Sequence, residues 1–127
     1  MIEHEINLPT RAGAMPTFIA HPERGGPHPA VLLLMDAPGV RDELRDMARR
    51  LATVGYVVLL PNLYYRAGTD TYYGPDVLTP GSDDYKRMRA VRTKMTIPPV
   101  MDDVADMLAF IDGFEAAAAV PVGAHGY

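Results

Sequence analysis

The sequence contains no cysteine, so neither a disulfide framework nor a thiolate metal site can form within it. It also lacks an excess of positive charge: the formal net charge is −4 at pH 7 and there is no basic tail, so we expect no nucleic acid partner. The longest apolar run is far too short to span a membrane, and the acidic, interrupted start does not resemble a signal peptide. These absences predict a cytoplasmic protein without a membrane partner.

Patterns that mark common cofactor sites are missing as well. No Gly-x-Gly-x-x-Gly or Walker pattern follows an apolar run, so nucleotide binding is not predicted. Asp102, Asp103 and Asp106 are close together in sequence, but no histidine or cysteine accompanies them, and a solvated helix face is the better interpretation. We therefore expect no metal and no organic cofactor.

The most regular part of the sequence is a strand–helix–strand pattern. Uninterrupted apolar runs at 30–35 and 56–60 flank a helical pattern that starts near Asp42 and stops before Gly55. Strands buried on both faces of a parallel sheet lack alternation, so the pattern predicts a β-α-β unit with a right-handed crossover. The predicted helix presents one apolar stripe to the sheet, made of Leu44, Met47, Ala48, Leu51 and Ala52.

The loops that follow the two predicted strands are the candidate walls of a site. In open α/β sheets, ligands bind at the carboxyl ends of the strands. Residues 36–41 follow the first apolar run, and residues 61–66 follow the second. Both loops should therefore lie at the same end of the sheet.

The remaining elements flank this unit on both sides. Alternation over 2–8 and a second run at 15–20 predict an antiparallel hairpin at one edge of the sheet. Ser82 is a predicted N-cap for a helix reaching about Lys94, and Pro98 opens a further helix that Gly113 ends. A short final strand is predicted over 122–126. The second of these helices should bury a stripe made of Met101, Val104, Ala105, Leu108 and Ile111.

Three sequence pieces, in this order and spacing, resemble the dienelactone hydrolase family of α/β-hydrolases. They are Leu-Met-Asp-Ala-Pro-Gly-Val at 34–40, Gly-Tyr-Val-Val-Leu-Leu-Pro-Asn-Leu-Tyr at 55–64, and Val-Gly-Ala-His-Gly-Tyr at 122–127. The resemblance implies an α/β fold in which residues 1–127 form a single, incomplete domain: the N-terminal half of the α/β-hydrolase sheet. The last piece looks like the approach to a nucleophile elbow, Gly-x-Cys/Ser-x-Gly, with Gly126 as its first glycine.

The nucleophile implied by the resemblance, a cysteine or serine, would be the next residue after Tyr127. The acid and the general-base histidine of the family would come later still. None of the four histidines fits the base, because all precede the elbow, and His125 is expected in the interior of the last strand. The 127-residue chain alone is therefore expected to be inactive.

The resemblance also implies roles for residues that are present. Asp36 would help to poise the nucleophile, and the backbone N–H of Ala37 would contribute to the oxyanion hole. The alternative for Asp36 is a turn residue whose carboxylate satisfies nearby N–H groups. Tyr64 and Tyr65 either line a substrate pocket or pack with their hydroxyls at the surface, and the choice stays open.

Cationic side chains near the site are candidates for binding a substrate carboxylate. Arg66 follows the second strand, and Arg89 represents a cluster of five cations over residues 86–94. An arginine can grip a carboxylate with two parallel hydrogen bonds. The alternative for each cation is a solvated helix or loop surface.

Two functions follow as hypotheses. The first is a hydrolase that cleaves a small-molecule carboxylic ester or lactone by nucleophilic acyl transfer. The second is a self-contained α/β module for binding or assembly, without chemistry of its own. Because no strand follows the one at 122–126, we also expect self-association through this unpaired sheet edge.

Overall fold

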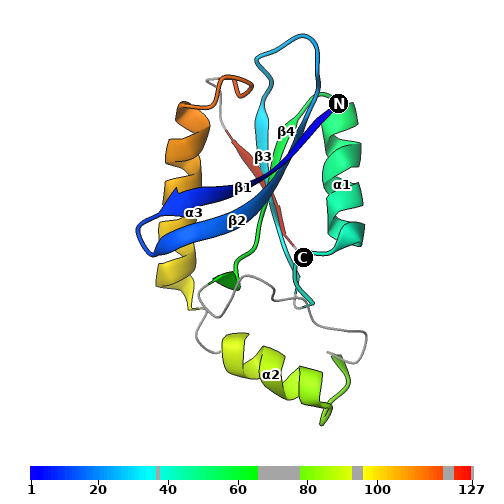
Figure 1. Ribbon diagram of the computed structural model, residues 1–127, viewed down its shortest axis with the longest axis vertical. Coiled ribbons are helices and arrows are strands. Elements are labelled where there is room, and N and C mark those ends of the chain that lie inside the picture. Colours follow the sequence, from blue (N-terminus) through cyan, green and yellow to red (C-terminus); the bar gives the residue numbers. More distant parts are fainter. Residues whose placement is uncertain (37, 66–77, 93–95, 119–121, 127) are drawn as a thin grey trace.

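The computed structural model describes residues 1–36, 38–65, 78–92, 96–118 and 122–126. Within these ranges, five strands form one mixed sheet in the order β1-β2-β4-β3-β5 (Figure 1). The predicted hairpin is confirmed: β1 (Ile2–Thr10) pairs antiparallel with β2 (Gly13–His21), and β1 is the edge strand. The hairpin is tight because the Thr10 hydroxyl donates to the Gly13 carbonyl at 2.7 Å and Gly13 adopts a φ of 136°.

The predicted β-α-β unit is confirmed at the centre of the sheet. β3 (Ala30–Leu34) and β4 (Val57–Pro61) pair in parallel, and α1 (Asp42–Thr53) connects them. Helix α1 buries Leu44, Ala48 and Ala52, which belong to the predicted stripe. Strand β4 also pairs antiparallel with β2, and this pairing joins the hairpin to the parallel part of the sheet.

The second half of the chain adds two helices and one strand. Helix α2 (Asp83–Arg92) begins at the predicted N-cap, because the Ser82 hydroxyl accepts the Tyr85 N–H at 3.1 Å; Lys94 lies outside the described residues. Helix α3 (Ile97–Asp112) precedes β5 (Gly123–Gly126), the predicted final strand, which pairs in parallel with β3. Figure 1 shows α1 and α3 on opposite faces of the sheet, and α2 beyond the carboxyl ends of the parallel strands.

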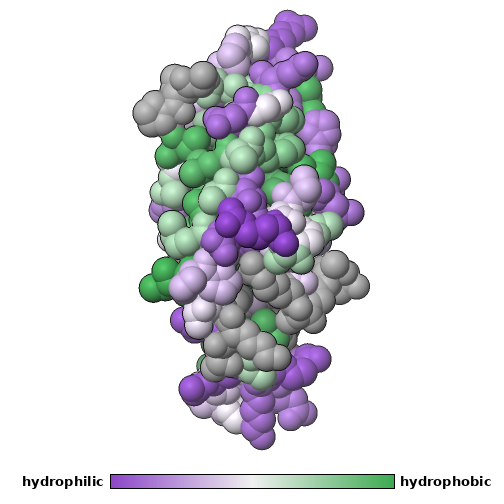
Figure 2. All heavy atoms as spheres, turned by 90° about the vertical axis from the view of Figure 1, so that its left-hand side faces the viewer, coloured by the Kyte–Doolittle hydropathy of each residue, from purple (hydrophilic) through white to green (hydrophobic). Residues whose placement is uncertain are grey.

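The predicted buried face of α3 is wrong for most of its residues. Met101 is 56% exposed and Leu108 is 40% exposed, and only Ile111 of the predicted stripe is buried. The buried face is instead formed by Asp103, Met107 and Ile111. Figure 2 looks onto the side that carries α3 and shows hydrophobic surface over much of its upper half. Asp103 lies on this buried face, where it makes a polar contact with Tyr65.

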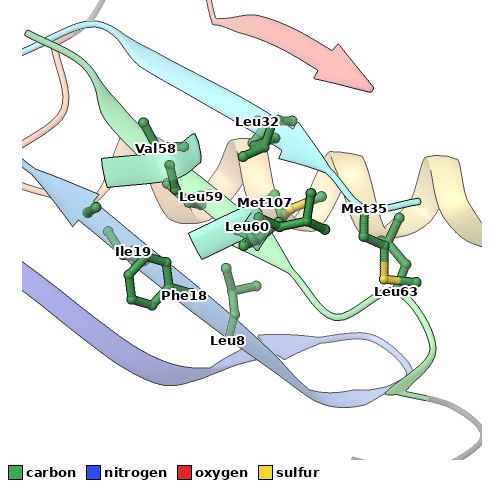
Figure 3. Packing of buried hydrophobic residues seen from close by; sticks show 14 of the residues in the cluster. Leu8, Phe18, Ile19, Leu32, Met35, Val58, Leu59, Leu60, Leu63 and Met107 are labelled. Atoms are coloured by element: carbon green, nitrogen blue, oxygen red, sulfur yellow. The ribbon is translucent and has the colours of Figure 1, made fainter. Parts of the chain in front are cut away.

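The hydrophobic core lies on both faces of the central strands. Every residue of β4 is buried, as expected for a strand covered on both sides. Figure 3 shows Leu32, Val58, Leu59 and Leu60 among side chains from β1, β2 and α3, including Met107. Burying a leucine-sized side chain stabilises a fold by roughly 1.5–3 kcal/mol. This core fixes β3 and β4, and therefore the loops at their carboxyl ends.

Strand β5 differs from the other parallel strands because all four of its residues are exposed. The prediction that His125 is an interior residue is therefore wrong. Among the described residues, β3 is the strand that pairs with β5, and β5 forms an edge of the sheet. No helix in the described part of the chain is long and apolar enough to cross a membrane.

Candidate active site

The carboxyl ends of β3 and β5 lie side by side. The parallel register places Leu34 opposite Gly126, the last described residue of the chain. Asp36 follows Leu34 by two residues, so it lies just beyond the end of the central strand. The chain that leaves β5 after Gly126 therefore starts next to the loop that holds Asp36. This is the place where chemistry is expected in an open α/β sheet.

Asp36 is held by Arg41, a residue that the sequence did not single out. The two guanidinium N–H groups of Arg41 donate to the two carboxylate oxygens of Asp36, at 2.6 and 3.0 Å. Both side chains are mostly shielded from solvent, with exposed fractions of 18% for Arg41 and 28% for Asp36. Bidentate pairs of this kind combine charge assistance with a fixed relative orientation of the two planes. The carboxylate is therefore oriented before any ligand arrives.

The turn between the two residues brings them together. The Gly39 N–H donates to the Asp36 carbonyl at 3.1 Å, and Gly39 adopts a φ of 92°, which a side chain would make costly. Arg41 then donates to the Gly39 carbonyl at 3.1 Å, so its guanidinium folds back over the turn. A cation five residues after a strand-terminal aspartate, with a Pro-Gly pair between them, is the sequence signal that could have found this pair.

The same corner is hollowed at the start of α1. A surface groove of about 420 Å³ is lined by Val40, Arg41, Asp42, Glu43 and Arg45. Glu43 contributes a second carboxylate to Arg41, with its oxygen 3.5 Å from the guanidinium. The groove therefore carries both signs of charge directly beside Asp36.

Tyr64 and Tyr65, at the end of β4, are both buried. The Tyr64 N–H donates to the side chain of Asn62 at 3.0 Å, which stabilises the turn after the strand. The hydroxyl of Tyr65 donates to the fully buried Asp103 of α3 at 2.7 Å and lies 3.0 Å from the Thr10 hydroxyl. The bond from Tyr65 to Asp103 joins the loop after β4 to α3, which favours a structural role for Tyr65. Substrate binding by Tyr64 and Tyr65 stays a prediction.

Arg89, the remaining predicted site residue within the described ranges, makes no hydrogen bond or ion pair with Asp36. Arg89 lies over the ring of Tyr85 on its own helix, with its guanidinium carbon 5.8 Å from the ring centre. Together with Met88 and Arg92, these two residues line a second groove of about 390 Å³. Ala37, Arg66 and Tyr127 lie outside the described residues.

The groups available for nucleophilic chemistry are few. Ser82 is the sole serine of the sequence, and its hydroxyl is the N-cap of α2. His21 and His28 contact the carbonyls of Pro22 and Arg24 through ring nitrogens, at 2.9 and 3.1 Å. Neither contact pairs a histidine with a hydroxyl nucleophile, as a catalytic dyad requires. The described residues therefore offer a positioned carboxylate without an activated nucleophile beside it.

The mixed sheet, the helices on both of its faces and the acidic residue after the central strand define the N-terminal part of an α/β-hydrolase sheet. A crystal structure from Klebsiella pneumoniae, titled "Putative Dienelactone Hydrolase", matches this fold with a TM-score of 0.81 at 26% identity. The match covers 99% of this chain and 49% of that chain.

The sequence profile of the dienelactone hydrolase family matches residues 15–127, and the chain belongs to this family. A relative from Methylorubrum extorquens, named "Putative carboxymethylenebutenolidase", is 32% identical over 127 residues, which are 100% of this chain and 41% of the relative. An Escherichia coli K12 protein of the same name is 38% identical over 63 residues, 49% of this chain and 23% of that protein. The chain spans less than half the length of these relatives.

Proposed function

We propose that the chain supplies the N-terminal half of a hydrolase that cleaves carboxylic esters or lactones by nucleophilic acyl transfer. The observation that carries the proposal is the position of Asp36, held by Arg41 at the carboxyl end of β3 and beside the end of β5. The names of the relatives support the same class of reaction.

The proposed mechanism needs a nucleophile immediately after Tyr127. Its sulfur or oxygen would attack the carbonyl carbon, the alkoxide would leave with a proton, and water would then hydrolyse the acyl-enzyme. Asp36 would poise the nucleophile, and the N–H of Ala37 would donate to the developing oxyanion. In this proposal Tyr64, Tyr65, Arg66 and Arg89 contact the substrate, and neither a metal nor an organic cofactor is required.

The proposed setting is the cytoplasm, with which a sequence free of cysteine is compatible. The 127-residue chain by itself is proposed to be inactive, because the described residues include no activated nucleophile. The competing proposal, a self-contained binding or assembly module, explains the fold equally well. The observation that favours the hydrolase over this module is the bidentate arginine–aspartate pair at the carboxyl end of the central strand.

One experiment separates the two proposals. The gene is read past codon 127, and the protein that includes any residues encoded there, here called the extended protein, is assayed on p-nitrophenyl acetate and an enol-lactone. A cysteine or serine at position 128, with turnover that disappears when this residue is replaced by alanine, supports the hydrolase. A stop codon after Tyr127, or an extended protein without turnover, contradicts it and favours the module.

A further inference from the structure

We propose that Arg41 is a positioning residue: its guanidinium fixes the carboxylate of Asp36 in the orientation that the reaction uses. The inference rests on the proposed hydrolase function and adds to it a residue that acts through Asp36. It starts from the two hydrogen bonds at 2.6 and 3.0 Å that join both Nη atoms of Arg41 to both oxygens of Asp36.

The first argument concerns the geometry of the carboxylate. An ionised carboxylate has about four lone-pair sites, and a bidentate arginine uses one on each oxygen. The other site on each oxygen stays available to a donor such as the O–H or S–H of a nucleophile. Because the guanidinium is planar, its two bonds also fix the direction in which these free sites point. Arg41 therefore orients Asp36 without blocking it.

The second argument concerns the cost of arginine at this position. Arg41 is the N-cap residue of α1, and its side chain makes no capping hydrogen bond. Serine, threonine, aspartate or asparagine would stabilise the start of the helix by about 0.5–2 kcal/mol relative to a residue that cannot cap. The guanidinium instead folds back to the Gly39 carbonyl and to Asp36. With arginine at position 41, the helix lacks a side-chain cap and the carboxylate of Asp36 is held in a fixed orientation.

The third argument concerns the further contacts that hold Arg41 and Asp36 in place. Arg41 is anchored by the Gly39 carbonyl at 3.1 Å in addition to Asp36, and the mostly exposed carboxylate of Glu43 lies 3.5 Å from the guanidinium. The backbone of Asp36 is held in turn by the Gly39 N–H. Groups that are locked by a shell of further contacts keep catalytic geometry within the narrow limits that rate acceleration requires. A misplacement of about 1 Å can cost on the order of 100-fold in rate.

The test compares Arg41→Gln with Arg49→Gln in the extended protein. Arg49 is a matched control because it lies on α1, the helix that Arg41 precedes, and because it also binds two carboxylates, those of Glu3 and Asp46. We expect Arg41→Gln to lower kcat by about 10- to 100-fold with KM changed less than about twofold. Arg49→Gln should leave kcat within about twofold of the original value. Arg41→Lys keeps the positive charge without the planar guanidinium, so its kcat should lie between those of Arg41→Gln and the original protein.

A double-mutant cycle distinguishes positioning from a general structural effect. If Arg41 acts through Asp36, Arg41→Gln should cause no further loss of kcat in a protein that already carries Asp36→Asn. Equal losses in both backgrounds, or the same loss from Arg49→Gln, would overturn the inference while the hydrolase function stands. An extended protein without any turnover would overturn the function first, and the positioning role with it.

Discussion

The hydroxyl of Tyr65 donates a 2.7 Å hydrogen bond to the carboxylate of Asp103, a residue of α3 that is fully buried. Tyr65 follows the carboxyl end of β4, so the bond joins the loop after a central strand to a helix on one face of the sheet. The Thr10 hydroxyl of the β1–β2 turn lies 3.0 Å from the same oxygen, and these three residues form a polar cluster. The cluster fixes the chain at the point where it leaves the sheet toward residues 66–77.

Replacement of Tyr65 by phenylalanine should therefore destabilise the fold. A buried carboxylate that loses a donor costs about 1–3 kcal/mol. We expect Tyr65→Phe to lower the free energy of unfolding by about that amount in urea melts, while Tyr56→Phe, at a tyrosine that is 37% exposed, changes it by less than about 0.5 kcal/mol. A raised KM without loss of stability would assign Tyr65 to substrate binding instead.

The sequence predicts the strands and α1 because their signals are local. Apolar runs without alternation are typical of strands that are buried on both faces. The apolar residues of α1 recur with the helical period and form one stripe. The face of α3 could not be read in this way. Asp103 is fully buried with the hydroxyl of Tyr65, 38 residues away, as one of its hydrogen-bond partners, and no periodicity reveals such a partner. Met101 and Leu108 then turn outward.

In the site, too, one feature follows from the sequence pattern and another depends on the three-dimensional structure. The place of Asp36 at the end of β3 follows from the sequence, since the apolar run stops there. Its pairing with Arg41 depends on the turn at Gly39, whose positive φ sends the guanidinium back toward the strand. Chain direction in a turn is set by backbone conformation rather than by hydrophobic pattern, so the pattern that predicts a helix start near Asp42 does not reveal this pair.

A second prediction concerns the contact between the β1–β2 turn and α3. Arg11 binds Asp106 at 3.1 Å and Asp102 at 3.2 Å, and its side-chain and backbone hydrogen bonds lower the pKa of Asp106 below the usual 3.8. When the pKa of a carboxyl group is lower in the folded state than in the unfolded state, its ionised form stabilises the fold. This stabilisation is complete above the pKa of the unfolded state and is lost as the pH falls through the pKa of the folded state. Asp106→Asn should thus be less stable than the original at pH 7, and this difference should shrink below about pH 4.

Urea melts at several pH values measure this difference. In an Arg11→Gln background the Asp106→Asn change should have a smaller effect, because the guanidinium hydrogen bonds are gone and only the backbone N–H of residue 11 still donates to Asp106. A stability difference that stays constant between pH 7 and pH 3 would contradict the assignment.

A third prediction concerns the exposed edge strand β5. Its four residues are exposed, and unpaired edge strands template association between chains. We propose that the 127-residue chain self-associates through this edge, so light scattering should give a mass that rises with concentration above 13.9 kDa. Ala124→Lys, which places a charge on the edge, should lower that mass. A concentration-independent monomer would contradict the proposal.

A fourth prediction is that the 127-residue chain has no esterase activity above buffer. Its sole serine caps α2, and it has no cysteine. The carboxylate of Asp36 does not replace a nucleophile with its base. Hydrolysis of p-nitrophenyl acetate and of an enol-lactone is the measurement. Saturable turnover that survives repurification would show that the chemistry lies within these residues.

The role of Asp36 in acyl transfer is tested most directly by Asp36→Ala in the extended protein, with kinetics and urea melts measured on the same samples. A partly exposed ion pair contributes up to about 1 kcal/mol to stability, so unfolding should change by no more than that. A carboxylate that poises the nucleophile should contribute about 100-fold or more to kcat/KM. A large loss of kcat/KM with a small loss of stability is the predicted result. Unchanged kinetics with a large loss of stability would make Asp36 a turn residue and contradict the proposed active site.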